Sequence, residues 1–266
     1  MDKEIKFLEE FNWPAIWVLA KRELLKFWRE KSRVISSFAQ AFFFLVVFSA
    51  GFSSLDIVIE GKTIASHAFT ASGIAAITIL FTGIFGGLGI IRDKMFGFMK
   101  ELLVAPVKRR TLMTGKTLGI ALQTLIQSLL IVIIASILGF FSYRIDLIWR
   151  TLLLIPVIIL VSIGIVGIGL TVASHLESFQ GFGLIQTFIV MPMFWLSGAL
   201  FPFNTVPQFM QIIMMGNPFT YGVDLFRAVI FGVSYFPVWL SLLVQVVFGA
   251  FLISLGARSF SKLEVS

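Results

Sequence analysis

Residues 63–91 read TIASHAFTASGIAAITILFTGIFGGLGII and contain no Asp, Glu, Lys or Arg. An α-helix rises about 1.5 Å per residue, so a stretch of this length can cross the roughly 30 Å of hydrocarbon in a bilayer. Five further stretches lack all four charged residue types and meet the same length, namely 34–55, 117–143, 151–176, 178–223 and 228–257. The sequence therefore predicts an all-α integral membrane protein with six transmembrane helices.

The overall composition agrees with this fold class. Of the 266 residues, 58% are hydrophobic and only 13% are charged, which leaves too little polar surface to cover a soluble globular protein. The chain has no Cys, so disulfides, thiolate metal sites and cysteine nucleophiles are excluded. A soluble enzyme is therefore not expected.

Two short motifs look like the end of a phosphate-binding loop but lack an essential residue. Gly61-Lys62-Thr63 and Gly115-Lys116-Thr117 are not preceded by the glycine that such a loop requires. His67 and His175 are isolated and are predicted on opposite sides of the membrane, so they do not form a metal site. No nucleophile is accompanied by a base and an orienting residue. We expect that the chain is not an enzyme, has no catalytic residues, binds no metal and holds no cofactor of its own.

The net charge of +7 is concentrated on one side of the predicted spans. Residues 1–33 hold eight Lys and Arg, 92–116 hold seven and 258–266 hold two, which makes 17. The alternate side holds four, namely Lys62, Arg144, Arg150 and Arg227. Because cytoplasmic loops carry an excess of basic residues, we expect a multi-pass protein of the cytoplasmic (inner) membrane with both termini in the cytoplasm. The charge has a topological cause and indicates no nucleic-acid partner.

The leader 1–33 has the pattern of an amphipathic helix that lies on the membrane surface. Apolar residues recur near helical spacing from Trp13 to Arg33, and basic residues form a separate face. Pro14 suits a first helical turn, and tryptophans anchor helices among lipid headgroups. The residues assigned to this contact with the lipid bilayer are Trp13, Trp17, Lys21, Arg22 and Trp28. A cytoplasmic extension of the first span would also explain the basic residues.

The loop 92–116 is too long and too patterned for a simple turn. Its stretch 96–104 is apolar enough to form a short helix, which Pro106 would end. An exposed short helix with one apolar side is typical of a docking site for a cytoplasmic partner. A surface loop whose basic residues only fix the topology explains the composition equally well.

The six predicted spans contain no ionisable acid or base among Asp, Glu, Lys and Arg. Ion-coupled transporters place such groups at membrane depth, and channels carry rings of charge or a filter segment. If the protein moves a substrate uphill, we therefore expect the energy to come from outside the spans. Gly83 and Gly87 form a small-xxx-small pair that suits either packing within the chain or a dimer contact.

The stretch 178–223 is long enough to span twice, but two spans would place the C-terminus on the outer side. Pro202, Pro207 and Asn217-Pro218 also interrupt it. We expect one span at about 182–201, followed on the outer side by a re-entrant or interfacial segment at 202–237 before the last span. Backbone of this kind must be covered by protein or face a wet cavity, which makes the segment a candidate gate.

Asp224 and Arg227 are spaced as i, i+3 neighbours on a helix and are isolated from other charges. Two interpretations are open. They form a structural pair that locks or gates the outer cavity, or an interfacial pair that caps the last span.

Two regions resemble the signatures of ABC-2-type exporter permeases. The first holds Arg92-Asp93-Lys94, Lys100-Glu101-Leu102-Leu103, Ala105-Pro106-Val107, Arg109 and Gly115-Lys116 and is similar to the coupling loop of the family. The second holds Glu177, Leu196-Ser197-Gly198, Phe201-Pro202, Val206-Pro207, Asn217-Pro218, Thr220-Tyr221, Val223-Asp224 and Arg227. The chain departs from the family pattern at Asp93, where Glu is usual, and at Phe98, where Thr is usual.

The resemblance implies an ABC-2, or type V, exporter architecture. Its parts are a leader with the interfacial helix (1–33), a six-helix transmembrane domain (34–257) and a cytoplasmic tail (258–266). It assigns coupling to an ATPase to Arg92, Gly97, Lys100, Glu101, Leu102, Leu103, Pro106, Arg109 and Glu177. It assigns the re-entrant gate to Pro202, Pro207, Asn217, Pro218, Tyr221, Asp224 and Arg227.

The resemblance also implies the function. Two copies of such a permease form the pathway, and two copies of a separate ABC ATPase subunit, which binds ATP and Mg, dock beneath them. The expected substrate is hydrophobic or amphipathic, such as a drug, a lipid or a glycolipid, and the abundance of Phe and Met is in keeping with it. The alternative is a non-transporting membrane scaffold or assembly factor that docks a cytoplasmic partner.

Overall fold

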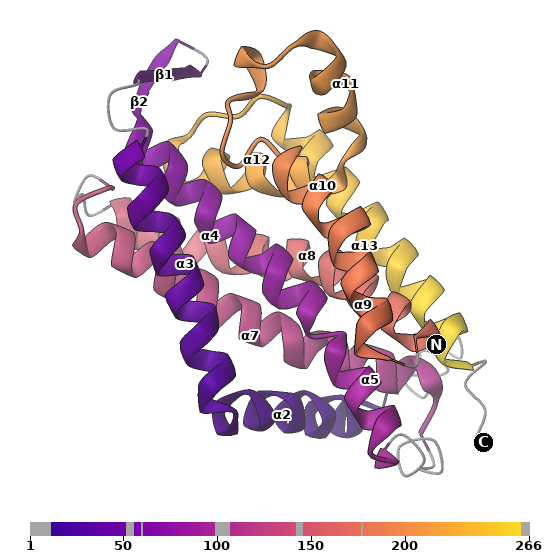
Figure 1. Ribbon diagram of the computed structural model, residues 1–266. Helices are drawn as coiled ribbons and strands as arrows, with labels where there is room; N and C mark the ends of the chain where they lie inside the picture. Colours follow the sequence, from indigo (N-terminus) through magenta and orange to yellow (C-terminus); the bar gives the residue numbers. More distant parts are fainter. Residues whose placement is uncertain are drawn as a thin grey trace, which may run out of the picture.

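The computed structural model describes residues 12–51, 56–59, 61–98, 107–141, 146–176 and 178–261. The elements, in chain order, are α2 (Trp13–Arg29), α3 (Lys31–Gly51), β1 (Asp56–Ile59), β2 (Lys62–Ala65), α4 (Ser66–Phe85), α5 (Leu88–Met95), α7 (Arg109–Ile137), α8 (Asp146–His175), α9 (Phe179–Ile185), the π-helical turn η1 (Gln186–Val190), α10 (Met191–Trp195), the 3₁₀ turn η2 (Phe203–Thr205), α11 (Gln208–Gly216), α12 (Pro218–Phe231) and α13 (Val238–Ser261). Figure 1 shows a helical bundle with α2 across one end and β1, β2 and α11 at the other. We call these the α2 end and the α11 end.

Among the described residues, four helices are long and apolar enough to cross a membrane, namely Ser66–Met95, Arg109–Ile137, Trp149–His175 and Val238–Ser259. The apolar part of α3 makes a fifth when it is joined to α2 across a bend of 79°. The helix Phe179–Trp195, at the predicted fifth span, is shorter and contains the π-helical turn η1 and Pro192. A helical protein with several membrane-capable helices is therefore confirmed, and a sixth span stays a prediction.

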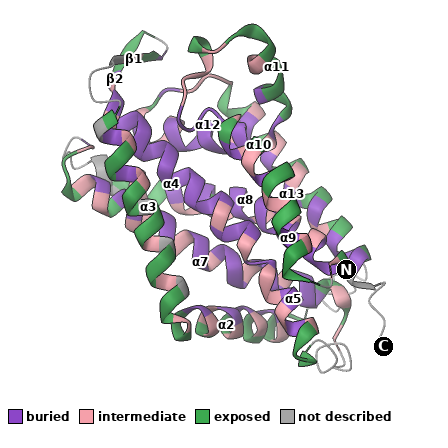
Figure 2. Cartoon of the chain, viewed as in Figure 1, coloured by how far each residue is buried: buried purple, intermediate pink, exposed green. Residues whose placement is uncertain are grey.

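Helix α4 lies at the centre of the bundle and is buried over almost its whole length, as Figure 2 shows. It contacts α3, α7, α8 and α12. Its small residues allow this close approach. A Cβ built on Gly83 would lie 2.9 Å from Cγ2 of Ile165, and one on Gly87 would lie 2.3 Å from the carbonyl oxygen of Gly169. Of the two uses predicted for these glycines, the structure supports packing within the chain.

The contact at Gly87 gives a first testable expectation. Gly87→Ala should destabilise the protein by about 1–3 kcal/mol, because the added methyl meets backbone rather than a movable side chain. Gly89→Ala is the matched control, since nothing lies within 4 Å of a Cβ there. Thermal unfolding in detergent compares the two variants. Equal unfolding temperatures for both would contradict the close contact of α8 with Gly87, which lies between α4 and α5.

An antiparallel hairpin interrupts the helical chain, so the all-α prediction is wrong at 56–65. The strands pair from Asp56 with Ala65 to Ile59 with Lys62, and Gly61 in the turn has φ +75°. The strand sequences DIVI and KTIA are rich in β-branched residues, which favour extended backbone, and glycine adopts positive φ without strain. In the sequence, the charged residues of this segment only mark where the predicted spans end, and no strand is predicted.

The loop predicted at 92–116 is shorter than expected, because α5 continues to Met95 and α7 begins at Arg109. Lys116 therefore lies two turns inside a helix and is buried. We call residues 96–108, to which the family resemblance assigns coupling to an ATPase, the coupling loop. The short helix predicted at 96–104 lies mostly outside the described residues, which include only 96–98 of it. Helix α3 also begins at Lys31, three residues before the predicted first span.

Candidate functional site

Helix α2 begins as its sequence predicts and packs closely on α7. The side chain of Asn12 accepts a hydrogen bond from the amide of Ala15 at 3.2 Å, and Pro14 occupies the first turn. The buried face of α2 consists of Ile16, Ala20, Glu23 and Phe27. Two glycines of α7, Gly115 and Gly119, allow the close approach, since a Cβ on either would lie 2.7 Å from a side-chain carbon of α2.

The opposite side of α2 carries the predicted interfacial residues. Trp13, Trp17, Lys21 and Trp28 are exposed, and Arg22 is half-buried. The 79° bend between α2 and α3 turns α2 across the end of the bundle, which favours the interfacial helix over a straight extension of the first span. Exposed tryptophans beside basic residues suit the headgroup layer of a bilayer. Contact with lipid itself stays a prediction.

Four charged side chains meet beneath α2, and we call them the charge cluster: Glu23, Lys26, Asp93 and Lys116. The Nζ of Lys116 lies 2.6 Å from Oδ2 of Asp93 and 3.3 Å from Oε1 of Glu23. The Nζ of Lys26 lies 3.0 Å from Oδ1 of Asp93 and 3.6 Å from Oε1 of Glu23. The side chains of Lys116 and Asp93 are only 3% and 4% exposed. Two acids and two bases thus balance in a cluster that joins α2, α5 and α7, in which Lys26 is partly exposed and the Asp93–Lys116 pair is buried.

Sequence reasoning did not find the charge cluster. In the sequence, Lys116 is one of the basic residues that determine the topology, and no role is predicted for Glu23. One signal was available, because Glu23 lies at helical spacing from Ile16, Ala20 and Phe27 on the apolar face of α2. A carboxylate on an apolar face is rarely buried without a partner.

The two neighbours of Asp93 also contact other helices. Arg92 forms an ion pair with Glu30, just after α2. Lys94 donates hydrogen bonds to the carbonyl oxygens of Ser174 and Leu176, where α8 ends. Arg92, assigned from the resemblance to ATPase coupling, is therefore attached to its own chain at the base of the coupling loop.

The other predicted coupling residues are only partly described. Gly97 has φ +76°, and Phe96 and Phe98 beside it are exposed. Arg109 begins α7 on the other side of the loop and is half-buried. Lys100, Glu101, Leu102, Leu103, Pro106 and Glu177 lie outside the described residues. The structure thus places both ends of the coupling loop at the α2 end.

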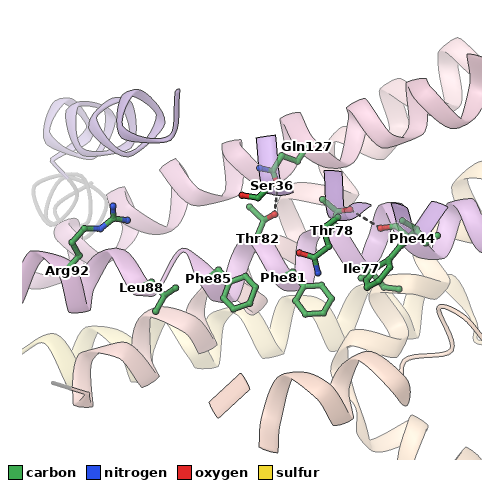
Figure 3. A pocket seen from close by; sticks show the side chains of 12 residues that line it. Ser36, Phe44, Ile77, Thr78, Phe81, Thr82, Phe85, Leu88, Arg92 and Gln127 are labelled. Atoms are coloured by element: carbon green, nitrogen blue, oxygen red, sulfur yellow. Dashed lines mark hydrogen bonds between the residues drawn. The ribbon is translucent and has the colours of Figure 1, made fainter. Parts of the chain in front are cut away.

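A cavity of about 350 Å³ lies beside α4. Its walls are Ser36, Gln40 and Phe44 of α3, Ile74, Ile77, Thr78, Phe81, Thr82 and Phe85 of α4, Leu88 and Arg92 of α5, and Gln127 of α7. Figure 3 shows the rings of Phe81 and Phe85 on α4 and the hydrogen bond between Thr82 and Gln127. These two rings stack with their centroids 5.9 Å apart.

The chemistry of this cavity changes along its length. Phe44, Ile74 and Ile77 form an apolar end toward the α11 end, whereas Ser36 and Arg92 lie toward the α2 end. Uncharged hydrogen-bonding groups lie between them, from Gln40, Thr78, Thr82 and Gln127. Such a surface suits an amphipathic ligand. Ionisable groups alone do not indicate this cavity from the sequence. Gln40 and Gln127 are an available signal, because they are polar residues inside apolar stretches.

The predicted gate segment folds into short helices at the α11 end. Pro207 precedes α11 and Pro218 begins α12. Asn217 joins the pieces, because its amide donates to the carbonyl oxygens of Met193 and Leu196 at 2.9 Å and its side-chain oxygen accepts from Phe219. Tyr221 donates to the carbonyl oxygen of Met215 at 3.0 Å. Pro202 lies at the turn into η2. This part of the chain consists of short helices before α13, and its re-entry into the membrane and its role as a gate stay predictions.

Asp224 and Arg227 are both buried and act on different parts of the fold. Arg227 donates to the carbonyl oxygen of Ala199 at 2.9 Å, and its guanidinium carbon lies 3.6 Å from the ring centroid of Phe69. Asp224 accepts from the amides of Tyr235 and Phe236 at 2.7 and 3.1 Å. Burial raises the pKa of the Tyr235 phenol in the same loop. The contacts of both residues lie within the fold, and Asp224 binds the backbone just before α13.

Two basic residues predicted on the outer side converge on the end of α12. Lys62 donates to the carbonyl oxygen of Gly232 at 3.3 Å, and Arg150 donates to that of Ile230. Cations are favourable at a helix C-terminus because its carbonyls carry partial negative charge. The hairpin and α8 are thereby attached to α12, a contact that no sequence pattern indicated.

Comparison with known proteins agrees with this arrangement. A model of the ABC-2 type transporter family matches residues 14–231. The putative transport permease ycf38 of Porphyra purpurea is 24% identical over 231 residues, covering 83% of this chain and 78% of that protein. Nodulation protein J of Rhizobium leguminosarum bv. viciae is 25% identical over 226 residues, with 83% of each chain covered.

A third relative carries a more specific description. It is the probable doxorubicin resistance ABC transporter permease protein DrrC of Mycobacterium tuberculosis, 26% identical over 220 residues, which cover 81% of this chain and 76% of that protein. The family match extends from the start of α2 through the end of α12 and so includes the charge cluster, the cavity and the segment at the α11 end. The chain is therefore a multi-pass membrane protein of the ABC-2 type transporter family.

Proposed function

We propose that the chain is the transmembrane permease subunit of an ATP-binding-cassette exporter. Two copies would form the pathway, and a separate ABC ATPase subunit would bind ATP and Mg. The observation that carries this proposal is the amphipathic cavity beside α4, which extends to Arg92 at the base of the coupling loop. A partner that moves the coupling loop would act on the same α4–α5 segment that forms the cavity wall. The chain itself is proposed to be neither an enzyme nor a cofactor-binding protein.

The proposed orientation places the α2 end and both termini in the cytoplasm. It is supported by the excess of basic residues in the leader and in 92–116. The exposed apolar side chains of Phe96 and Phe98 then face the cytoplasm, where an ATPase subunit would dock. In this orientation 202–237 forms the outer gate, and Phe179–Trp195 with its following turns supplies the fifth of six spans.

The proposed substrate is a hydrophobic or amphipathic molecule such as a drug, lipid or glycolipid. The cavity supports this class because aromatic and aliphatic walls alternate with uncharged hydrogen-bonding groups. The relative described as a doxorubicin resistance permease makes doxorubicin a suitable first probe. A fluorescently labelled glycolipid is a second probe with a larger polar part.

Gln40→Trp tests the cavity as the pathway. Gln40 is exposed on α3 and borders the cavity, so an indole there should obstruct it without disturbing buried hydrogen bonds. We expect probe-stimulated ATPase activity to fall about tenfold or more, since a ligand group that no longer fits loses at least about 1.4 kcal/mol. Phe43→Trp is the matched control, because Phe43 is exposed on the same helix and does not border the cavity.

The same assay separates the two functions. The reconstituted permease and its ATPase subunit should show probe-stimulated ATP hydrolysis in lipid. If the chain is only a scaffold that docks a cytoplasmic partner, we expect a stable complex whose ATP hydrolysis does not respond to any probe. The rate of ATP hydrolysis would then be equal in Gln40→Trp and Phe43→Trp.

A further inference from the structure

Two cations that have no carboxylate partner among the described residues meet at the end of α12. Lys62 of the hairpin and Arg150 of α8 donate only to backbone carbonyls of 229–232. A Cβ built on Gly232 would lie 3.9 Å from Nζ of Lys62 and 4.0 Å from Nη1 of Arg150, so these nitrogens are separated by no more than the sum of the two distances. We call Lys62 and Arg150 the cation pair. Like charges this close repel each other unless an anion lies between them.

The last carbonyls of α12 compensate the cation pair only in part. A helix C-terminus carries roughly half a negative charge, whereas the pair brings two positive charges. Gly232, which ends the helix with φ +68°, has no side chain, and among the described atoms only the two cationic nitrogens lie within 4 Å of a Cβ built there. A phosphate whose oxygens accept charge-assisted hydrogen bonds of about 2.8 Å on two sides can therefore join the two nitrogens.

The cation pair lies where lipid headgroups are expected. Two membrane-capable helices, Ser66–Met95 and Trp149–His175, begin beside it. Lys62 comes shortly before the first of these helices, and Arg150 is the second residue of the other. Trp149 is exposed, and exposed tryptophans at the ends of spans lie among headgroups. An anion that reaches the pair from the membrane is therefore a headgroup phosphate.

An exposed apolar face of α8 continues from the cation pair toward the middle of the helix. Trp149, Leu152, Leu153 and Pro156 are all exposed, and they are spaced as i, i+3, i+4 and i+7, so they share one side of the helix. Arg150 precedes Leu153 by one turn and lies at the headgroup edge of this face. Positive charge at the edge of an apolar strip matches the phosphate and the acyl chains of a phospholipid.

We propose that the cation pair and the exposed face of α8 bind one anionic phospholipid of the leaflet at the α11 end. Its phosphate lies between Lys62 and Arg150, relieves their repulsion and so joins the hairpin, α8 and the end of α12. Its acyl chains cover Trp149, Leu152 and Leu153. A lipid with a net negative charge is preferred over a zwitterionic one, because the pair carries two positive charges. This site shares no residue with the cavity beside α4 and requires neither transport nor an ATPase subunit.

Quenching of Trp149 by brominated lipid tests the site. The native chain and Trp149→Phe are reconstituted in phosphatidylcholine bilayers, and the difference in fluorescence between the two reports Trp149 alone. In one series the bromine is on the acyl chains of added phosphatidylglycerol, and in the other it is on the same mole fraction of phosphatidylcholine. The ratio of the two quenching efficiencies gives the preference for the anionic lipid at this position.

The variant Lys62→Gln with Arg150→Gln removes the charge of the cation pair. Glutamine keeps an amide that can donate to the carbonyls of α12, so the change acts mainly on charge. Lys108→Gln with Arg110→Gln is the matched control, since it removes the same net charge from two exposed residues at the α2 end. Each double variant is measured with Trp149 and with Trp149→Phe, and thermal unfolding shows whether it is folded.

In the native chain and in the control we expect phosphatidylglycerol to be preferred at Trp149 by about tenfold, because each Lys or Arg near a membrane surface favours anionic lipid several-fold. In Lys62→Gln with Arg150→Gln the preference should disappear. Excess glycerophosphoglycerol, which carries the same phosphate without acyl chains, should not reduce the quenching.

Several results would overturn the site. A native chain with no preference for phosphatidylglycerol does so whatever the stability of the variants, and so does a folded Lys62→Gln with Arg150→Gln chain that keeps the native preference. Displacement by glycerophosphoglycerol would show that the pair binds a free anion instead of a phospholipid. If neither brominated lipid quenched Trp149, a second copy of the chain would cover this face of α8 instead of lipid.

Discussion

Arg227→Met is expected to lower the free energy of unfolding by about 3–5 kcal/mol, because a buried hydrogen bond from a charged group (about 1.5–3 kcal/mol) and a desolvated cation–π contact (about 2 kcal/mol) are lost together. The guanidinium is 2% exposed, donates to the carbonyl oxygen of Ala199 and lies over the ring of Phe69. Methionine fills a similar volume but leaves that carbonyl without its donor and the ring of Phe69 without its cation. Detergent-denaturant titration in mixed micelles measures the loss.

Two control variants separate charge from shape in this experiment. Arg227→Lys keeps a cation but loses the planar group that stacks on Phe69. Its free energy of unfolding should therefore lie between those of Arg227→Met and the native chain. Arg110→Met removes an exposed cation and should change stability by less than about 0.5 kcal/mol. If Arg227→Met were as stable as Arg110→Met, the guanidinium would not hold the turn at 196–201 against α4.

Deletion of 97–105 should abolish ATP-driven transport while membrane insertion is retained. The two ends of the coupling loop lie on α5 and α7 at the α2 end, and Phe96 and Phe98 are exposed there. Removing the loop takes away the surface on which an ATPase subunit would act but leaves every membrane-capable helix intact. Glu101→Arg should have the same effect by reversing one charge in the segment to which the family resemblance assigns coupling. Co-purification with the ATPase subunit and transport of the probe are the two measurements.

The control for the loop is Lys108→Gln, which removes an exposed cation at its edge and keeps its length. This variant should insert, bind the ATPase subunit and transport. Normal ATP-driven export by the deletion variant would refute the coupling assignment, whereas loss of membrane insertion would show that the loop is needed for folding.

The long helices could be predicted from sequence because hydrocarbon imposes one simple requirement, an uncharged stretch of sufficient length. The same stretches indicate only in part which helix lies at the centre of the bundle and where the backbone bends. Gly86 and Gly87 divide α4 from α5 inside a single charge-free stretch, and the hairpin at 56–65 lies where charges had ended the prediction. The residue count of a stretch does not show where the backbone bends.

Residues of the candidate site that belong to a family pattern could be predicted from sequence. Contacts between residues that lie far apart in the sequence could not. The pattern pointed to Arg92, but its partner Glu30 is 62 residues away in sequence. Asp93 stood out only as a departure from the family pattern, yet it bonds to side chains of both α2 and α7. Such pairs depend on how α2 crosses α7, and the glycines that permit this crossing have no distinctive local pattern.

Helix α12 has its terminal peptide groups solvated by the protein itself. In water, the ends of a short helix are hydrated, and in hydrocarbon each bare carbonyl or amide is costly. Asn217 serves the first turn of α12, while Arg150 and Lys62, which come from α8 and the hairpin, serve its last carbonyls. A fourteen-residue helix too short to cross a bilayer can therefore end within the fold with terminal amide and carbonyl groups bonded to protein.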